Sequence, residues 1–246
     1  MNNYTIRKGV ISEGGLRKVN RIGILGGISY ESTIKYYELI LEKYYEKFKN
    51  YNYPEIIIFS LNFQIITNLE RKNEKKKYID YLMNGIKSLE KGGANFIVIA
   101  ANSPHAVYND LKNMSAVPIL SILEAVAKRA QQENMKKLLL LGIKFTMQSS
   151  FYQLYFKNLG IEVITPNDQE QDVIEKVIFE ELVIGFYKKE SKNKIIQIIN
   201  NYSNVDGIIL GCTELPLVLQ QKDTDIKLLD TIELHVEAAL NYFLNL

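Results

Sequence analysis

Short, predominantly apolar runs recur along the chain, and they limit the folds open to it more than any other feature. They span residues 21–27, 55–61, 95–101, 117–122, 136–143, 161–166, 206–212 and 226–230. Most are rich in leucine and β-branched residues and do not alternate with polar residues. Strands that are buried on both faces of a parallel sheet have this composition. The runs therefore predict strands inside parallel sheets.

Helical patterns separate these runs. In residues 31–48 and 76–93, apolar residues return every three or four positions, as on one face of a helix. The second pattern ends in Gly92–Gly93, which suits a helix C-cap. Strands that alternate with helices are typical of βαβ units, so the predicted class is α/β with parallel sheets.

The chain also contains a weak internal duplication. Residues 21–33 resemble residues 137–150, because each segment has a strand, a glycine and a turn bearing Ser or Thr. Residues 94–105 resemble residues 204–216 in the same way. Chance similarity between apolar strands would also produce such matches. We interpret them as two pseudo-symmetric α/β halves that face each other across a cleft.

The duplication suggests where each half begins and ends. We expect the first half to comprise residues 20–117 together with 226–246, and the second half to comprise residues 118–225. Residues 1–19 would form an N-terminal extension, because the segment SEGG within them is typical of a flexible terminus.

Composition excludes several classes of protein. A formal charge of +2 on 246 residues gives no reason to expect nucleic acid or a membrane surface as partner. The basic runs at 71–77 and 188–194 are interpreted as solvated helix ends or loops rather than as a binding patch. The N-terminal segment has no apolar run suited to a signal peptide, and no stretch reaches the length of a transmembrane helix. We therefore expect a cytoplasmic protein.

Cofactor motifs are also missing. One cysteine excludes an intrachain disulfide, and one cysteine with two histidines is a poor supply of metal ligands. The turn after the first strand reads GGIS, which matches neither the dinucleotide-binding glycine pattern nor the phosphate-binding loop. No metal and no nucleotide cofactor are predicted.

Polar residues follow the strands that the duplication relates. Ligands of parallel α/β sheets bind beyond the carboxyl ends of the strands, so these four turns should converge on the cleft. The small polar groups and turn amides there suit a small anion such as a carboxylate. The residues expected to line the cleft are Ser29, Tyr30, Asn102, Ser103, Thr146, Cys212 and Thr213.

Cys212 is the only cysteine, and it ends a strand just before the turn TELP. Free amides near a helix start would lower the pKa of this thiol and favour the thiolate. The alternative is a buried, chemically inert cysteine. The position of Cys212 in the duplication favours the functional interpretation.

Three further residues are candidates for proton transfer or packing. Glu214 is either a proton carrier of the cleft or an acid favoured at a helix start. His105 could face Cys212 as one member of a Cys–His pair, although a lone histidine is more often structural. His235, in a helical pattern near the C-terminus, is interpreted as a packing or hydrogen-bonding residue.

Three motifs resemble those of the aspartate/glutamate racemase family, the cofactor-independent amino-acid racemases. GILGGISYESTIKYYELI (23–40) is similar to the N-terminal signature of the family. GANFIVIAANSPH (93–105) lies where members carry a Cys-Asn-Thr turn closed by His, and GCTELPLVL (211–219) resembles the second cysteine turn. The resemblance extends from about residue 20 to about residue 240.

The resemblance implies two α/β domains with the active site between them, often in a homodimer. It also implies catalysis without pyridoxal phosphate or metal. In this mechanism two thiols face opposite sides of the α-carbon of an amino acid, and one takes a proton while the other delivers one. Positioned donors around the carboxylate must stabilise the carbanion-like state.

Two departures from the family pattern affect this expectation. Cys212 matches the second cysteine, but Ala101 stands at the position of the first, beside Asn102 and Ser103. Residues 62–67 contain no Arg and Val183–Ile184 no Lys, where relatives specific for aspartate have basic side chains. An acidic substrate is therefore not predicted.

Three hypotheses remain open from the sequence. The first is an amino-acid racemase in which Cys212 serves one face of the substrate and His105, Glu214 or a water molecule serves the other. The second is a single-cysteine lyase, decarboxylase or isomerase that acts on a small carboxylate. The third is a binding protein that keeps the cleft without the chemistry.

Overall fold

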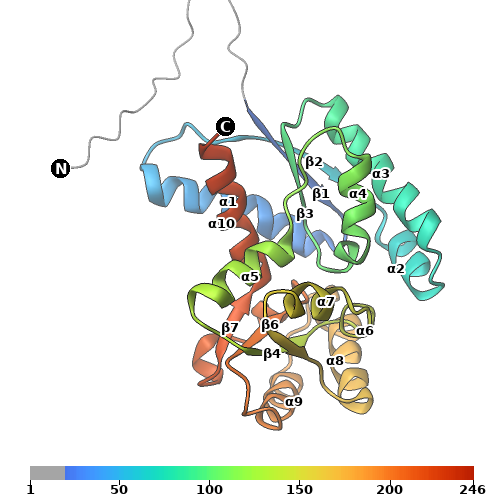
Figure 1. The fold of residues 1–246 in the computed structure, drawn as a ribbon, viewed down its shortest axis with the longest axis vertical. Coiled ribbons are helices and arrows are strands. Elements are labelled where there is room, and N and C mark those ends of the chain that lie inside the picture. Colours follow the sequence, from blue (N-terminus) through green and yellow to red (C-terminus); the bar gives the residue numbers. More distant parts are fainter. Residues whose placement is uncertain (1–19) are drawn as a thin grey trace, which may run out of the picture.

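The computed structural model describes residues 20–246, so the predicted N-terminal extension lies outside the described residues. The chain forms two α/β halves that lie one above the other (Figure 1). The elements up to the middle of the chain are β1 (Arg21–Gly26), α1 (Tyr30–Phe48), β2 (Glu55–Ser60), α2 (Phe63–Arg71), α3 (Lys75–Lys91), β3 (Phe96–Ile99), α4 (Tyr108–Met114) and α5 (Ile122–Gln132). The later elements are β4 (Lys137–Leu141), α6 (Lys144–Gln148), α7 (Phe151–Lys157), β5 (Glu162–Ile164), α8 (Asp168–Glu180), α9 (Lys189–Asn200), β6 (Gly207–Leu210), β7 (Lys227–Asp230) and α10 (Thr231–Leu244).

The first sheet has the strand order β2-β1-β3, and its strands are parallel. Ile24 at the centre of β1 pairs with Ile58 of β2 and Val98 of β3. The apolar run at 117–122 does not form a full strand. It contributes a single parallel bridge between Ile119 and Ile97. This bridge occupies the edge beyond β3.

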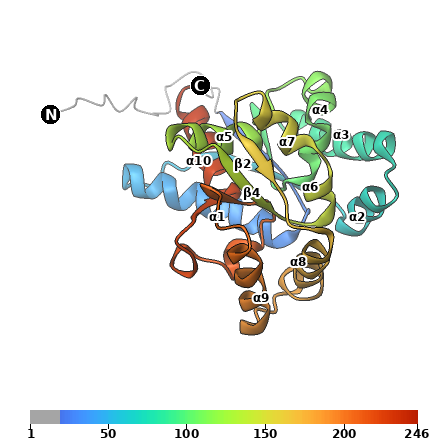
Figure 2. The same cartoon turned by 60° about the horizontal axis from the view of Figure 1, so that its bottom comes forward.

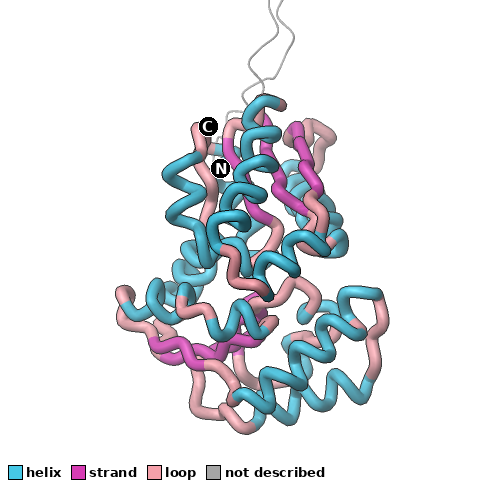
Figure 3. The backbone as a smooth tube through the Cα atoms, turned by 90° about the vertical axis from the view of Figure 1, so that its right-hand side faces the viewer, coloured by secondary structure: helices cyan, strands magenta, loops and turns pink. Residues whose placement is uncertain are grey.

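The second sheet repeats this arrangement with the order β5-β4-β6-β7, again with parallel pairing. β4 corresponds to β1, β5 to β2 and β6 to β3, while β7 occupies the place of the Ile119 bridge. The strands form two separate groups in Figure 3, one in each half. The predicted class, two parallel-sheet α/β halves, is confirmed.

Both faces of the first sheet are covered by helices, as its uniformly apolar strands require. On one face α3 and α4 pack against side chains such as Leu25 and Ile97. On the other face α1 and α10 pack against Ile22, Ile24 and Val98. β2 is the edge strand and is only partly buried.

The second sheet is likewise covered by helices on both faces. α5 and α7 cover the face that presents Leu138 and Leu140. α8 and α9 cover the face that presents Leu139 and Leu141. Figure 2 shows α8 and α9 on the opposite side of β4 from α5.

Two helices cross between the halves. α5 follows the Ile119 bridge of the first sheet and packs on the second sheet, whereas α10 follows β7 of the second sheet and packs on the first. Figure 1 shows α10 rising from the lower half along the upper one. The predicted division placed residues 226–246 in the first half. It differs from the structure at β7, which pairs with β6 in the second sheet.

The two basic runs lie at helix boundaries. Residues 71–77 connect α2 to α3, residues 188–194 begin α9, and both are largely exposed. Within residues 20–246, no helix combines the length and apolar character that a membrane crossing requires.

Candidate active site

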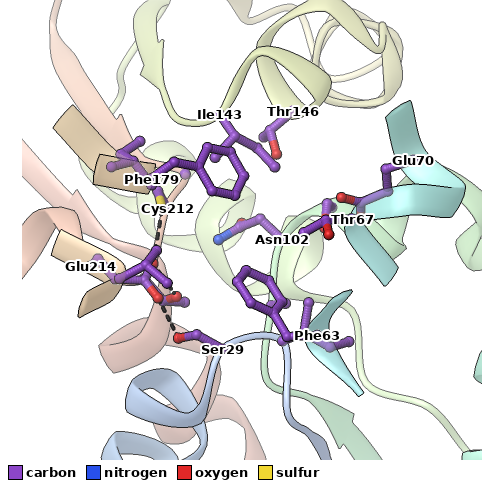
Figure 4. Close-up of a pocket in the computed structure, with 17 residues that line it drawn as sticks. Ser29, Phe63, Thr67, Glu70, Asn102, Ile143, Thr146, Phe179, Cys212 and Glu214 are labelled. Atoms are coloured by element: carbon purple, nitrogen blue, oxygen red, sulfur yellow. Dashed lines mark hydrogen bonds between the residues drawn. The ribbon is translucent and has the colours of Figure 1, made fainter. Parts of the chain in front are cut away.

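A cavity lies between the two halves, beyond the carboxyl ends of the central strands. It encloses about 440 Å³ when the space open to solvent at its mouth is included. The turns after β1, β3, β4 and β6 line it, as predicted, and α2, α8 and the segment after α8 complete the wall. The residues that line it are Ile28, Ser29, Phe63, Thr67, Glu70, Ala101, Asn102, Ser103, Ile143, Thr146, Ile178, Phe179, Val183, Gly211, Cys212, Thr213 and Glu214. We call this cavity the cleft (Figure 4).

The turn after β1 brings Ser29 to the cleft. Gly27 has a φ of 79°, and a Cβ at this position would lie 2.2 Å from the carbonyl oxygen of Leu61, so the tight turn requires glycine. Thr33 of α1 fixes the turn, because its hydroxyl accepts from the Gly27 amide and donates to the Ser29 carbonyl. Tyr30, which was also expected in the cleft, is 56% exposed and does not line it.

Cys212, Thr213 and Glu214 form the turn after β6, and all three are buried. The Cys212 Sγ donates to Glu214 Oε2 over 2.9 Å, and the Thr213 hydroxyl donates to the same oxygen over 2.9 Å. Ser29 Oγ donates to Glu214 Oε1. Glu214 therefore accepts hydrogen bonds from both halves and joins the thiol to the turn after β1.

The expected preference of Cys212 for the thiolate form is wrong. Burial, together with the adjacent Glu214 carboxylate, raises the pKa of Cys212 well above its ordinary value. The amides of Thr213 and Glu214 act in the opposite direction, but their effect is smaller. A carboxylate this close disfavours a second negative charge. The resting form of Cys212 is therefore the neutral thiol.

The turn after β3 presents Ala101, Asn102 and Ser103 to the cleft from the other half. Both the nitrogen and the oxygen of the Asn102 side-chain amide form hydrogen bonds. Its Nδ2 donates to Thr231 Oγ1 over 3.0 Å, and its Oδ1 accepts from the Tyr152 hydroxyl over 2.6 Å. Because Tyr152 belongs to α7 and Thr231 begins α10, Asn102 also connects the halves.

His105 does not line the cleft, and its ring is held by the backbone. The Ile122 amide donates to Nε2 over 3.1 Å, which leaves Nδ1 as the donor to the Ala101 carbonyl at 3.1 Å. Burial lowers the pKa of His105 to about 4, so the ring is neutral. His105 ties the Ala101 turn to the start of α5. It does not face Cys212.

His235 has the packing and hydrogen-bonding surroundings that were expected of it. It is fully buried in α10, and its Nδ1 accepts from the Tyr36 hydroxyl over 2.8 Å. Its Nε2 lies 3.2 Å from the Leu120 carbonyl, to which it donates. Burial, with His105 nearby, lowers the pKa of His235 to about 3.

Thr146, in α6, lies in the cleft as predicted. Its side chain is 1% exposed, and its hydroxyl has no hydrogen-bond partner among the described residues. Buried polar groups are nearly always paired, because an unpaired one loses its hydration without compensation. The Thr146 hydroxyl is therefore available to a ligand in the cleft.

The sequence did not predict the cleft residues that lie on helices α2 and α8. Phe63, Thr67 and Glu70 project from α2, while Phe179 of α8 reaches the cleft from the other half (Figure 4). The Phe63 and Phe179 rings stack with centroids 6.5 Å apart. Because α2 follows the carboxyl end of β2, the rule that located the four turns would also have located the start of this helix.

Among residues 20–246, Glu214 and Glu70 are the charged residues that line the cleft, and no lysine, arginine or histidine of this part of the chain lines it. Within residues 20–246, no group of three or more His, Cys, Asp or Glu side chains could hold a metal ion.

Known proteins share both the sequence and the fold of this chain. RacX, a broad specificity amino-acid racemase of Bacillus subtilis, is 29% identical over 221 residues, which cover 85% of this chain and 92% of that protein. The crystal structure of an aspartate racemase homologue from Pyrococcus horikoshii has a TM-score of 0.79 and 38% identity, covering 92% of this chain and 99% of that one. Glutamate racemase from Campylobacter jejuni shares the fold, with a TM-score of 0.65 and 20% identity over 90% of this chain and 85% of that one.

The family model for Asp/Glu/Hydantoin racemase matches residues 25–239, which include all of the turns that line the cleft. The resemblance noted in the three sequence motifs is thereby confirmed. The chain belongs to the Asp/Glu/Hydantoin racemase family, a family of isomerases.

Proposed function

We propose that this protein is a racemase that moves the α-proton of an amino acid, without pyridoxal phosphate, and uses Cys212 as its acid and base. The observation that carries the proposal is the hydrogen bond from the Cys212 thiol to the Glu214 carboxylate in the cleft between the halves. A thiol in contact with a carboxylate has a partner that can accept its proton and return it. Family membership and the racemase RacX support the choice of reaction.

The proton steps follow from this pair. Transfer of the thiol proton to Glu214 Oε2 produces a thiolate, which takes the α-proton as the electron pair of the C–H bond stays on the α-carbon. The thiol formed in this way returns a proton to the same face. Inversion requires a proton from the opposite face, where the side chain of Ala101 has none to give.

The contacts of His105 and Glu214 argue against either of them as the second donor in the proposed mechanism. Both ring nitrogens of His105 are occupied by backbone partners, and Glu214 lies on the Cys212 side. Water is then the remaining donor among those considered from the sequence. A site with one thiol should be directional, because proton exchange at the Cys212 face does not depend on the slower opposite face.

The substrate carboxylate would bind to donors that the cleft leaves available. Thr146 offers an unpartnered hydroxyl, and the turns after β3 and β6 offer backbone amides, whereas the Thr213 hydroxyl already donates to Glu214. Asn102 is oriented by its two side-chain partners. Such preorganised donors stabilise the charge that develops on the carboxylate as the α-proton leaves.

Cofactor independence is part of the proposal. Enzymes that use pyridoxal phosphate hold it as a Schiff base with a lysine, and no lysine is among the described residues that line the cleft. The acid and base groups must then come from the protein and solvent.

We also propose a homodimer, and the exposed face of α1 supports it. Tyr36, Ile40 and Tyr44 point into the core, whereas another stripe of apolar residues faces solvent. The stripe consists of Tyr30, Ile34, Tyr37, Tyr45 and Phe48, which are 37% to 56% exposed. Contiguous exposed apolar surface of this kind is typical of protein interfaces.

The proposal is tested by α-proton exchange in D₂O. The protein is incubated with each L- and D-amino acid, and loss of the α-proton signal is followed by NMR. Exchange with one or more amino acids that is abolished in Cys212→Ser supports the proposal. Exchange that persists unchanged in the folded Cys212→Ser protein would exclude the role of the thiol.

One observation favours a second function: the side chain of Ala101 has no group that could give or take a proton. A lyase, decarboxylase or isomerase that acts on a small carboxylate needs one proton donor, and Cys212 suffices for it. The absence of exchange with every amino acid, together with turnover of a carboxylate that lacks an amino group, would select this alternative.

A further inference from the structure

The two carboxylates of the cleft lie at opposite ends of it. Glu214 is beside Cys212, where its oxygens are occupied by donors from the turns after β1 and β6. Glu70 lies at the other end, on α2 next to Thr67 (Figure 4). The reacting α-carbon must lie close to the Cys212 sulfur, so Glu70 is placed to meet the substrate side chain.

Glu70 is a buried carboxylate without a cationic partner. Its residue is 9% exposed, and Oε1 accepts a hydrogen bond of 2.7 Å from the Tyr78 hydroxyl. None of the ion pairs between described residues includes Glu70. Burial of a carboxylate is costly unless a cation or several donors compensate it.

The charged groups around Glu70 do not supply this compensation. Burial is the largest effect and leaves the pKa of the Glu70 carboxyl above its ordinary value. Hydrogen bonds from Ser103 and Tyr78 lower this pKa, and the weaker effects of Arg71 and of Glu175 in α8 oppose each other. The guanidinium of Arg71 lies over the Phe179 ring, 5.4 Å from its centroid, and Arg71 does not line the cleft. A ligand that brings a positive charge into the cleft would provide what the protein does not.

Part of the wall between the two ends is apolar, although Asn102 also lies between Cys212 and Glu70 (Figure 4). Phe63, Ile143, Phe179 and Val183 line the apolar part. An aliphatic chain can lie against these side chains. An acidic side chain would meet the Glu70 carboxylate, and no cation among the described lining residues could bind it. Attraction of opposite charges and repulsion of like charges both contribute to such selectivity.

We propose that the cleft selects amino acids with an aliphatic side chain that ends in an ammonium or guanidinium group, and that Glu70 binds this cation. The class comprises lysine, ornithine and arginine. The proposal rests on the proposed racemase function for the orientation of the substrate, with its α-carbon at Cys212. It adds the identity of the side chain and the residue that recognises it.

The first test compares substrates that differ in the charge at the end of the side chain. L-Lysine and L-norleucine have the same carbon chain and differ in the terminal ammonium, while L-glutamate carries the opposite charge. We expect kcat/KM for α-proton exchange in the wild-type protein to be at least about 10-fold higher for lysine than for norleucine, and lowest for glutamate. Equal values for lysine and norleucine, or a preference for glutamate, would overturn the proposal.

The second test removes the charge of Glu70. In Glu70→Gln we expect KM for lysine to rise about 10- to 100-fold, while the kinetics of norleucine stay unchanged. Glu74→Gln is the matched control, because Glu74 lies just beyond α2, does not line the cleft and should leave both substrates unaffected. An equal loss of kcat for both substrates in Glu70→Gln would place Glu70 in the chemistry or the folding, against the proposal.

A binding measurement separates this proposal from the racemase function. Calorimetric titration of Cys212→Ser with lysine and norleucine does not depend on turnover. Tighter binding of lysine that is lost on adding Glu70→Gln supports the cation site, even if no amino acid exchanges its α-proton and the racemase function fails. If α-proton exchange showed no preference for lysine, and lysine and norleucine bound with equal affinity, the racemase function would still hold and the cation site would be excluded.

Discussion

The thiol of Cys212 donates to the carboxylate of Glu214 over 2.9 Å, and burial together with this carboxylate raises the pKa of the thiol and keeps it neutral. Two residues apart in the sequence, they form an acid–base pair because the turn after β6 folds Glu214 back on the sulfur. Ser29 holds the same carboxylate from the other half. Glu214 therefore contributes both to the contact between the halves and to the protonation state of the thiol.

Replacing Glu214 with Gln should make the thiol more acidic and the enzyme slower. The pKa of Cys212 falls because the adjacent negative charge is gone, while α-proton exchange falls about 100-fold because the proton acceptor is gone. Alkylation rates of Cys212 with iodoacetamide across pH report the pKa. A pH profile of alkylation identical to that of the wild type would contradict this account. Glu214→Asp, which keeps the charge, is the control.

Replacing Ala101 with Cys should supply the missing donor on the second face. Ala101 is 4% exposed and lines the cleft, so a thiol there would face the substrate opposite Cys212. We expect racemisation in both directions to rise about 10-fold or more, within the range of a positioned acid or base. Optical rotation or chiral chromatography measures it. A folded variant without any gain would mean that the cleft is not organised around two opposed faces.

Replacing Thr146 with Val should weaken substrate binding without weakening the fold. The Thr146 hydroxyl is buried and unpartnered among the described residues, so its removal does not break a hydrogen bond of the protein. We expect Tm to be unchanged or higher and KM to rise about 10-fold. Thr146→Ser keeps the hydroxyl and should keep KM near that of the wild type. A lower Tm with an unchanged KM would assign the hydroxyl a purely structural role.

The buried histidines should destabilise the protein in mild acid. Their pKa values are about 4 for His105 and about 3 for His235, so the folded state stays unprotonated where the unfolded chain takes up protons near pH 6.5. Protonation then favours unfolding, and stability falls as pH decreases from 7 to 5 by about 2 kcal/mol for each histidine. Urea unfolding measures the free energy at both pH values.

The variants His105→Gln and His235→Gln isolate this effect from the carboxyls. Burial raises the pKa of Glu70 and Asp230, so these two groups act in the opposite direction over the same range. Each histidine variant should lose less stability between pH 7 and pH 5 than the wild type. Equal losses in both variants and the wild type would show that the histidines do not cause the acid sensitivity.

A charge on the exposed stripe of α1 should separate a dimer into monomers. Ile34→Asp combined with Tyr37→Asp places two desolvated charges in the proposed interface. Light scattering coupled to size exclusion should give the mass of a dimer for the wild type and of a monomer for the variant. Asn84→Asp, on the exposed face of α3, is the control. A monomeric wild type would refute the proposed homodimer.

The strands and their order of appearance were accessible from the sequence, because burial on both faces leaves uniformly apolar runs. The run at 117–122 failed as a strand because only Ile119 meets β3 before α5 begins. An apolar run in the sequence indicates that a segment is buried, but it does not indicate how many of its residues pair with a neighbouring strand.

The turns of the cleft were predictable, but the chemistry within them was not. The strand-end rule located Ser29, Asn102, Thr146 and Cys212, since it depends on topology alone. The pKa of Cys212 depends on a carboxylate and on burial that arise only in the folded protein. Glu70 was missed because it lies on the third turn of α2, where its orientation follows from the packing of the halves.

Because α5 and α10 cross between the halves, the two pseudo-symmetric halves are not independent structural units. A shortened gene that encoded only the first sheet would lack α10 and expose the face that carries Ile22, Ile24 and Val98. One that encoded only the second sheet would lack α5 if it began at β4. The first sheet depends on a helix from the far end of the chain and the second on the helix that precedes β4, so cutting the gene at β4 would deprive both sheets of a covering helix.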